Sequence, residues 1–193
     1  MYSLIIDTST KFYYLCLVKD GEIIKEIKEE SNRNHAPYSV LAIEEVLNEN
    51  KLTINDINEV ICGIGPGSYT GLRISLTIAK MICSFKEIPL KTISTLYLMS
   101  SGYDNLVVPI IDARRGNFFS AAYNDKVILE DKLRTKEEIE NEVKDFTYID
   151  EDMFKVNITK VLENAVVEEM VDGVVPNYLR ITEAEYNLKK NND

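Results

Sequence analysis

The sequence predicts an α/β protein built from two halves of related design, the second smaller than the first. Two observations carry this prediction. The order strand, turn, strand, strand, helix occurs twice along the chain. A buried strand, a glycine-rich loop and a helix also follow one another between residues 59 and 86. The 193 residues are enough for a core without disulfides or metal, and we divide them at 1–102 and 103–193.

The first half opens with three expected strands. Residues 2–7 form a short apolar run. Residues 12–19 and 22–27 are rich in β-forming residues and flank the pair Asp20-Gly21. An Asp-Gly pair between two such runs is typical of a tight hairpin, so the second and third strands are expected to pair antiparallel.

Two helices are expected in the first half. Residues 38–50 place four apolar side chains on one face at helical spacing, namely Val40, Ile43, Val46 and Leu47. The second helix, at residues 72–86, follows a buried strand at residues 59–64 and the glycine-rich loop. The loop is therefore expected at the start of that helix.

The remaining chain follows a similar order in a shorter form. Residues 89–94 and 95–101 are expected to form a strand and a short helix. Further strands are expected at 105–112, 117–123, 126–133 and 145–150, with helices at 135–143 and 158–170. Glu138 lies three residues after Thr135, which is typical of a capped helix start.

The composition favours a soluble, cytoplasmic protein and argues against nucleic-acid binding by this chain alone. There are 32 Asp and Glu against 22 Lys and Arg, a formal net charge of −10, so the surface repels a polyanion on average. Cys16, Cys62 and Cys83 lie in apolar runs without a Cys-x-x-Cys pair, which predicts reduced core residues. The N-terminus has no basic region before its apolar run, and no apolar stretch is long enough to span a bilayer.

The most informative segment runs from Gly63 to Arg73 and holds four of the chain's eight glycines. A glycine loop between a strand and a helix lets backbone N–H groups approach an anion. The segment lacks the Gly-Lys-Ser/Thr of a Walker A loop, and Ser68 and Thr70 stand where a dinucleotide fingerprint needs glycine. Two interpretations stay open: an anion-binding loop, or glycines that only permit positive φ and tight packing.

Two of the expected strands end in polar turns. Asp7-Thr8-Ser9 can hold a phosphate with its metal or cap the turn, and capping is the commoner use of such residues. The turn at residues 112–116 contains an acid and two arginines. Such a set can grip a carboxylate or phosphate, although a solvated turn is again the commoner explanation.

Hydrolase and metal chemistry are poorly supported by the sequence. His35 is the only histidine, so the chain cannot supply a metal-binding His pair or a Ser-His-Asp triad. Ser68 lacks the glycines of a nucleophile elbow, because Pro66 and Thr70 stand at those positions. A serine hydrolase or another peptidase is therefore not expected.

The helix at residues 72–86 has more apolar surface than a sheet alone can cover, about 220° of its circumference. The side expected to face the sheet comprises Leu72, Leu76, Ala79 and Cys83. The side that needs another cover comprises Ile74, Ile78, Met81 and Phe85. The first helix can supply that cover through Val40, Ile43 and Leu47. Tyr38 and Leu41 fall outside that helix's own apolar face, so the helix pair is expected to present apolar surface to a partner.

Four segments of the chain together resemble the TsaB (YeaZ) family: MYSLIIDTST, GPGSYTGLRISLTIAK, IIDARRGNFFSAAY and PNYLRITEAE. They span most of the chain, and the run from GPGS to TGLR is the most specific. The resemblance implies the actin-like fold shared with Hsp70 and sugar kinases (ASKHA), an α/β fold with two lobes of mixed sheet flanked by helices. The short second half implies a reduced second lobe.

The resemblance also implies a function. Family members are non-catalytic partners that form a heterodimer with the catalytic paralogue TsaD, and the ATPase TsaE joins them. The complex transfers threonylcarbamoyl from threonylcarbamoyl-adenylate to N6 of the adenosine next to the tRNA anticodon. On this interpretation the chain is a scaffold or activator rather than an enzyme. It meets tRNA only through the complex. The exposed apolar face of the helix pair is in turn expected to drive a homodimer when the partner is absent.

The same resemblance implies no cofactor or metal in this chain, because ATP and a metal belong to the complex and its catalytic subunit. The family's signature loop corresponds to Gly65, Pro66, Gly67, Ser68, Thr70, Gly71 and Arg73. A possible vestigial nucleotide site corresponds to Asp7, Thr8, Ser9 and Asp112. The expected partner interface comprises Tyr38, Leu41, Ile74, Ile78, Met81 and Phe85.

The chain departs from the family pattern at two positions. Tyr69 stands where Phe is usual, and Ser75 stands where Gly is usual, which predicts a looser helix contact at Ser75. An alternative function also stays open, since actin-like folds host several activities. It is an autonomous nucleotide-binding protein or small-molecule kinase of the same fold.

Overall fold

The computed structural model describes residues 1–30 and 35–179, with side chains from residue 38 onward in the first helix. Its strands are β1 (Tyr2–Asp7), β2 (Phe12–Lys19), β3 (Glu22–Glu30), β4 (Glu59–Gly63), β5 (Leu90–Ile93), β6 (Val107–Asp112), β7 (Asn117–Tyr123), β8 (Val127–Thr135), β9 (Thr147–Ile149) and β10 (Val166–Val167). Its helices are α1 (His35–Glu49), α2 (Tyr69–Lys86), α3 (Thr95–Ser100), α4 (Lys136–Glu142) and α5 (Ile158–Asn164), with 3-10 turns η1 (Ile54–Asp56), η2 (Glu151–Met153) and η3 (Val171–Gly173).

The strands form two mixed sheets of related topology. The first has six strands in the order β10-β5-β4-β1-β2-β3, and the second has four in the order β8-β7-β6-β9. In each sheet three consecutive strands pair antiparallel, and the strand after the next helix lies parallel to the first of them. The predicted duplication is confirmed. Among the residues that the structure describes, the second sheet has no counterpart of β5 or β10, so the second lobe is reduced.

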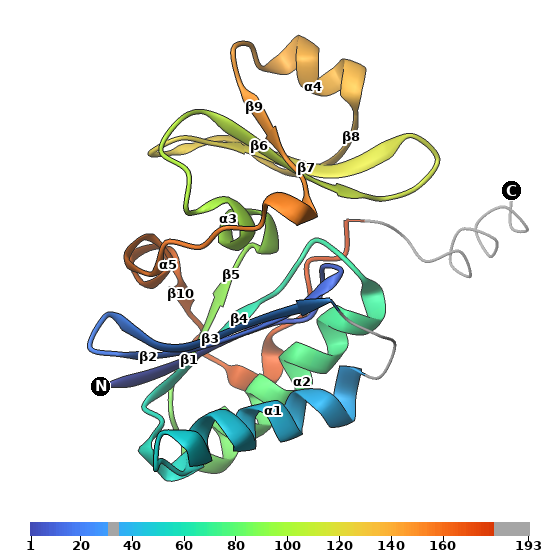
Figure 1. Cartoon of the computed structure of the whole chain (residues 1–193). Coiled ribbons are helices and arrows are strands. Elements are labelled where there is room, and N and C mark those ends of the chain that lie inside the picture. The colour runs from blue at the N-terminus through green and yellow to red at the C-terminus, as the bar shows by residue number, and fades with distance from the viewer. Residues whose placement is uncertain (31–34, 180–193) are drawn as a thin grey trace, which may run out of the picture.

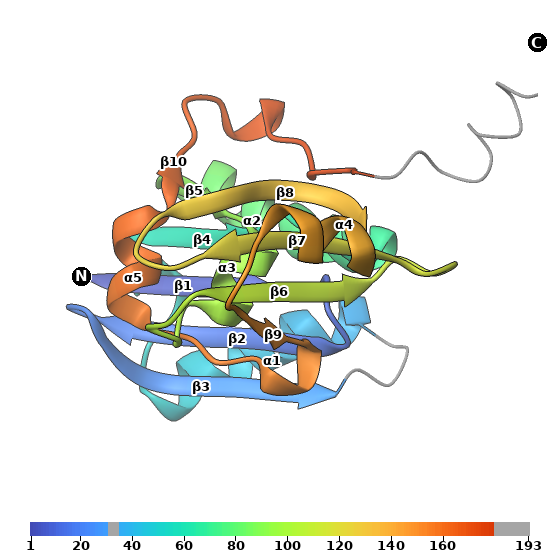
Figure 2. The same cartoon turned by 90° about the horizontal axis from the view of Figure 1, so that it is seen from above.

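The two sheets are stacked, with α3 between them (Figure 1). α1 and α2 lie on the outer face of the first sheet, and α4 lies on the outer side of the second. Seen from above, the second sheet lies over the first, so the first strands of the two lobes end toward the same side of the molecule (Figure 2). This arrangement brings the turns that follow β1 and β6 to one edge.

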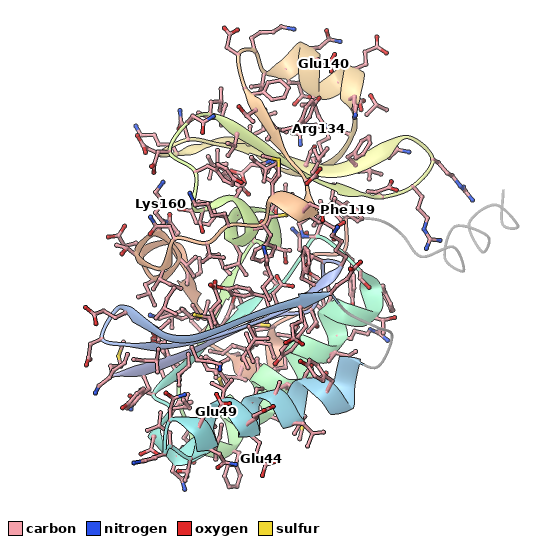
Figure 3. The ribbon with its side chains drawn as sticks, in the orientation of Figure 1. Glu44, Glu49, Phe119, Arg134, Glu140 and Lys160 are labelled. Atoms are coloured by element: carbon pink, nitrogen blue, oxygen red, sulfur yellow. The ribbon has the colours of Figure 1, made fainter. Side chains whose placement is uncertain are left out.

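A single hydrophobic cluster spans both lobes. It contains Ile5 and Tyr14 from the first sheet, Leu96 from α3, and Ile111 and Phe119 from the second sheet. Figure 3 shows Phe119 between the two sheets. A second cluster lies between the first sheet and the pair α1 and α2. The lobes therefore share a core rather than touching only along a polar surface.

Local signals in the sequence place several element boundaries. Asp20 and Gly21 adopt positive φ values of 51° and 87°, so the expected tight hairpin between β2 and β3 is confirmed. Thr135 caps α4: its side chain accepts a hydrogen bond from the Glu138 backbone N–H, and the Glu138 carboxylate accepts one from the Thr135 N–H. All three cysteines are buried and free, as predicted.

The helix expected at residues 158–170 is wrong in its second half. α5 ends at Asn164, and Val166 and Val167 then pair antiparallel with β5 at the edge of the first sheet. The apolar residues that suggested a longer helix include these two valines. Both are β-branched, and they pair with the edge strand of the sheet instead of continuing the helix. After residue 103 the chain thus does not stay with the second sheet. The division at 1–102 and 103–193 stays a prediction.

Among the described residues, no helix is both long enough and apolar enough to cross a membrane.

Candidate functional site

The glycine loop is built by close packing against the turn after β1. Ser68 caps α2, since its Oγ accepts a hydrogen bond from the Gly71 N–H at 3.3 Å, and the Ser68 N–H donates to Ser9 O at 2.6 Å. A Cβ on Gly71 would lie 1.8 Å from Thr8 O, and one on Gly67 would lie 2.4 Å from Ser9 O. These two glycines are needed because backbone approaches backbone, which favours the packing interpretation of the loop.

Asp7 lies inside the protein, not on its surface. Its side chain is 1% exposed, and the Ser9 N–H donates to Asp7 Oδ1 at 2.6 Å. Oδ2 lies 2.6 Å from Thr95 Oγ1 at the start of α3. Burial raises the pKa of the Asp7 carboxyl, and hydrogen bonds from Ser9 and Thr95 oppose that shift.

The residues of the possible vestigial nucleotide site are only partly brought together. Thr8 is buried, and its hydroxyl donates to Gly71 O at 2.6 Å. Ser9 and Asp112 both line a cleft between the lobes, whereas Asp7 and Thr8 do not. Asp112 is exposed, and its Oδ1 accepts a hydrogen bond from the Arg114 N–H at 2.7 Å. Three of the four side chains, those of Asp7, Thr8 and Ser9, are therefore buried and used in structural hydrogen bonds.

The interlobe cleft has a volume of about 1150 Å³. Its apolar lining comes from Leu72, Ile111, Phe119, Leu133 and Leu179. Its polar lining includes Lys11, Arg114, Arg115 and Glu151, together with Gly67, Ser68, Tyr69 and Thr70 at the start of α2. Glu151 accepts a hydrogen bond from the Lys11 N–H at 2.5 Å, which ties η2 to the turn after β1.

Arg73 of the signature loop fastens the last described segment of the chain. Its guanidinium lies 4.4 Å from the centre of the Tyr69 ring, and its Nε donates to Tyr178 Oη at 3.1 Å. The Tyr69 and Tyr178 rings are stacked at 4.9 Å. No pattern in the sequence predicts this contact, because nothing in the spacing links Tyr178 to Arg73. Arg180 and the rest of that motif lie outside the described residues.

The outer face of α1 and α2 carries exposed apolar side chains, which residues 1–30 and 35–179 leave uncovered. Tyr38, Leu41, Met81 and Phe85 are 41%, 61%, 67% and 79% exposed, respectively, and Ile74 and Ile78 are half-buried. The predicted sheet side of α2 is confirmed, because Leu72, Leu76, Ala79 and Cys83 are all buried. Of the three residues expected to cover the opposite side, Ile43 and Leu47 are buried but Val40 is 55% exposed. Cover by α1 is therefore incomplete.

A groove of about 450 Å³ runs between the two helices and η1. Its apolar walls are formed by Val40, Ile43, Leu47, Leu52, Ile54, Ile78, Met81 and Ile82. Glu44 also borders it, and Figure 3 shows Glu44 on the side of α1 that faces away from the sheet. An apolar groove with an exposed acidic residue at its edge fits a protein partner better than a small polar ligand.

Within residues 1–30 and 35–179, no group of three His, Cys, Asp or Glu side chains is placed to hold a metal ion. His35 begins α1, and its side chain lies outside the described ones. Ser75 is fully buried inside α2, where its hydroxyl donates to Gly71 O at 3.4 Å.

Comparison with known proteins agrees with the motifs. Residues 22–157 match the family model described as TsaD: tRNA N6-adenosine threonylcarbamoyltransferase. The tRNA threonylcarbamoyladenosine biosynthesis protein TsaB of Bacillus subtilis is 30% identical, with 96% of each chain covered. The protein of the same name from Escherichia coli is 33% identical over 64% of this chain and 55% of its own length.

Two solved structures from Pseudomonas aeruginosa show the same fold. One, described as similar to peptidase YEAZ, has a TM-score of 0.77 at 17% identity and covers 93% of this chain and 99% of its own. The other, YeaZ, has a TM-score of 0.73 at 18% identity and covers 92% of this chain and 99% of its own. The arrangement that the sequence resemblance implied, two lobes of mixed sheet flanked by helices, is confirmed.

Proposed function

This chain belongs to the TsaB family, and from that membership we propose that it acts as a non-catalytic subunit in the synthesis of threonylcarbamoyladenosine in tRNA. Its proposed partner is a TsaD-type catalytic subunit, which it binds through α1 and α2 to form a heterodimer. The observation that carries the proposal is the exposed apolar face of these two helices.

Burial of that face supplies the free energy of association. Full burial of one large apolar side chain contributes about 1.5–3 kcal/mol, and Leu41, Met81 and Phe85 each expose more than half of their surface. Two matching helices of the partner would complete a four-helix contact, with the groove between α1 and α2 accepting a side chain. The contact would hold the catalytic subunit in its active arrangement.

The architecture of the lobes supports a scaffold role. Asp7 and Thr8, at the strand end where a phosphate would be held, are engaged in buried hydrogen bonds. The shared interlobe core joins the two sheets through α3. Because these polar residues at the end of β1 are used in hydrogen bonds inside the protein, the chain is better suited to presenting a fixed surface than to turning over nucleotide. We accordingly place ATP, the metal and the contact with tRNA in the other subunits of the complex, including a TsaE-type ATPase.

Self-association is the expected behaviour when the partner is absent, because a second copy can cover the same face. Glu44 and Glu45 are exposed on α1, so a symmetric contact between two α1 helices brings like charges together. The homodimer should therefore be weaker than the heterodimer and should be strengthened by salt. Sedimentation at low and high ionic strength measures this difference.

Reconstitution tests the proposal. TsaD-type and TsaE-type subunits, ATP and threonylcarbamoyl-adenylate are incubated with tRNA, with and without this chain. Modification should require the chain, and the chain alone should be inactive. Ile74→Glu and Ile78→Glu should abolish co-elution with the TsaD-type subunit in gel filtration while leaving the fold intact.

The matched control is Ile128→Glu, which places the same charge at a 46% exposed apolar position on β8 in the other lobe. Co-elution should survive this change. If both substitutions on α2 leave the heterodimer intact, the proposed face is wrong. If the chain alone modifies tRNA, the scaffold role fails.

The second candidate function, an autonomous nucleotide-binding protein or small-molecule kinase, is favoured by the cleft between the lobes, where Arg114 and the start of α2 line the same space. Isothermal titration with ATP and magnesium distinguishes it from the scaffold. Heat of binding to the isolated chain supports this candidate, and a silent titration removes it.

A further inference from the structure

We infer that Asp7 is held as a neutral carboxylic acid, and that its proton closes a ring of hydrogen bonds with the hydroxyls of Ser9 and Thr95. The ring fastens the end of β1 to the start of α3 and to the glycine loop. This inference concerns the interior of the first lobe and does not depend on the proposed function.

The ring follows from three short oxygen–oxygen contacts. Asp7 Oδ1 lies 2.6 Å from Ser9 Oγ, Ser9 Oγ lies 2.8 Å from Thr95 Oγ1, and Thr95 Oγ1 lies 2.6 Å from Asp7 Oδ2. Each contact is short enough to require a proton between its oxygens. The two hydroxyls carry only two protons, because a hydroxyl has a single O–H donor. If Asp7 were ionised, one of the three contacts would have no proton, and the lone pairs of its two oxygens would face each other.

A third proton on Asp7 completes the set, and the backbone fixes its position. The Ser9 N–H donates to Asp7 Oδ1 at 2.6 Å, so Oδ1 is the carbonyl oxygen, accepting from that N–H and from the Ser9 hydroxyl. Oδ2 then carries the proton and donates to Thr95 Oγ1. Thr95 donates in turn to Ser9 Oγ. Thr95 Oγ1 also accepts from the Gly65 N–H at 3.0 Å, which brings the glycine loop into the network.

The surroundings favour the neutral form. Asp7, Ser9 and Thr95 are 1%, 1% and 0% exposed, and an isolated charge is costly at such a position. Among the described residues, the titratable groups that border Asp7 are Tyr14, its cross-strand partner on β2, and Cys62 on β4. Burial raises the pKa of both groups, so neither offers a charge. The elements that carry Ser9, Thr95 and Gly65 contribute only hydroxyl and N–H groups to this network.

The space around Oδ2 admits no other ligand. A Cβ on Gly63 would lie 1.8 Å from that oxygen, so even a methyl group is excluded on that side. A neutral acid enclosed in this way is a poor ligand for a cation. Asp7 is accordingly a positioning residue, which sets where the glycine loop ends and α2 begins.

The protonation state is measured directly by 13C NMR of aspartate carboxyl carbons in the whole protein. At neutral pH, wild type should show an aspartate resonance at the shift of a protonated acid that belongs to Asp7. Asp7→Asn should remove it, and this variant should fold, because its Oδ1 accepts from Ser9 and its Nδ2 donates to Thr95 Oγ1. Asp112→Asn is the matched control, at the end of the first strand of the other lobe, and should leave the resonance unchanged.

The wild-type spectrum keeps the inference testable if Asp7→Asn does not fold. Thr95→Val removes one hydroxyl of the ring and should shift the same resonance, whereas Thr135→Val, at the N-cap of α4, should not. A wild-type spectrum in which every aspartate carboxyl is ionised at neutral pH overturns the inference. The inference is also overturned if Asp7→Asn leaves every protonated aspartate resonance in place, since those resonances then belong to other residues.

Discussion

The first strands of the two lobes end in similar turns, but the two turns have different structural roles. β1 and β6 both end in an aspartate whose Oδ1 accepts a hydrogen bond from the N–H two residues later, at 2.6 Å for Asp7 and 2.7 Å for Asp112. Asp7 is buried against α3, whereas Asp112 is exposed at the interlobe cleft. The same local turn is thus a structural joint in one lobe and a cleft wall in the other. Burial, which comes from the elements packed around the turn, decides the role.

The largest expected effect tests how tightly the first turn is packed. Gly71→Ala would place a Cβ 1.8 Å from Thr8 O, a backbone atom that cannot move aside. We expect a loss of about 3 kcal/mol or more in the free energy of unfolding. Gly116→Ala in the second lobe meets nothing within 4 Å and adds only the strain of a φ of +76°, about 1 kcal/mol. Urea denaturation of both variants measures the contrast, and equal losses would contradict it.

A second test uses pH to examine the buried aspartate at the end of β1. Burial raises the pKa of Asp7 above its ordinary value of 3.8, so the folded chain binds this proton more tightly than the unfolded chain. The resulting stability is complete below the unfolded-state pKa and is lost as pH rises through the folded-state pKa. Relative to wild type, Asp7→Asn should gain stability with pH, by at most about 1.4 kcal/mol per pH unit. Parallel curves for the two proteins would show that Asp7 is ionised.

A third test compares the outer faces of the lobes. Phe85 on α2 is 79% exposed and Ile128 on β8 is 46% exposed. Phe85→Ala should weaken binding to a TsaD-type subunit by about 1–2 kcal/mol while changing stability by no more than about 0.5 kcal/mol. Ile128→Ala should change neither quantity. Calorimetric titration and thermal denaturation give the two values, and an equal loss of binding in both variants would remove the distinction between the faces.

The smallest expected effect concerns the segment that returns from the second lobe to the first. Tyr178→Ala removes the stack on Tyr69 and should cost about 1 kcal/mol of stability. Tyr178→Phe keeps the ring and should retain most of that stability. Thermal denaturation of both variants checks the order. If both variants lose the same stability, the hydrogen bond from Arg73 matters more than the stack.

The sequence predicts the fold well where the signal is local. The Asp20-Gly21 hairpin, the Thr135 cap and the sheet-facing side of α2 depend on nearest neighbours and helical spacing, and all three are confirmed. The end of α5 could not be predicted in this way. Val166 and Val167 form a strand only because the edge of β5 is available to pair with them.

The candidate site could be predicted in part. The exposed side chains on the α1 and α2 face are predictable from helical spacing. The apolar arc of α2 is wider than the sheet can cover, so some of its apolar side chains must lie outside that contact. Whether Asp7 or Asp112 would be buried could not be read from two similar turns. Thr95 and Tyr178, which lie 88 and 105 residues from their contacts with Asp7 and Arg73, carry no sequence signal of those contacts.

The core shared by the two lobes has a mechanical consequence. Lobes that pivot against each other need a hinge whose opening exposes little apolar surface. Here, separation of the sheets would expose Leu96, Ile111 and Phe119 to water, so rotation between the lobes carries the cost of breaking a core. We therefore expect the two lobes to move together, and on the proposed function any change of shape would belong to the partner subunits.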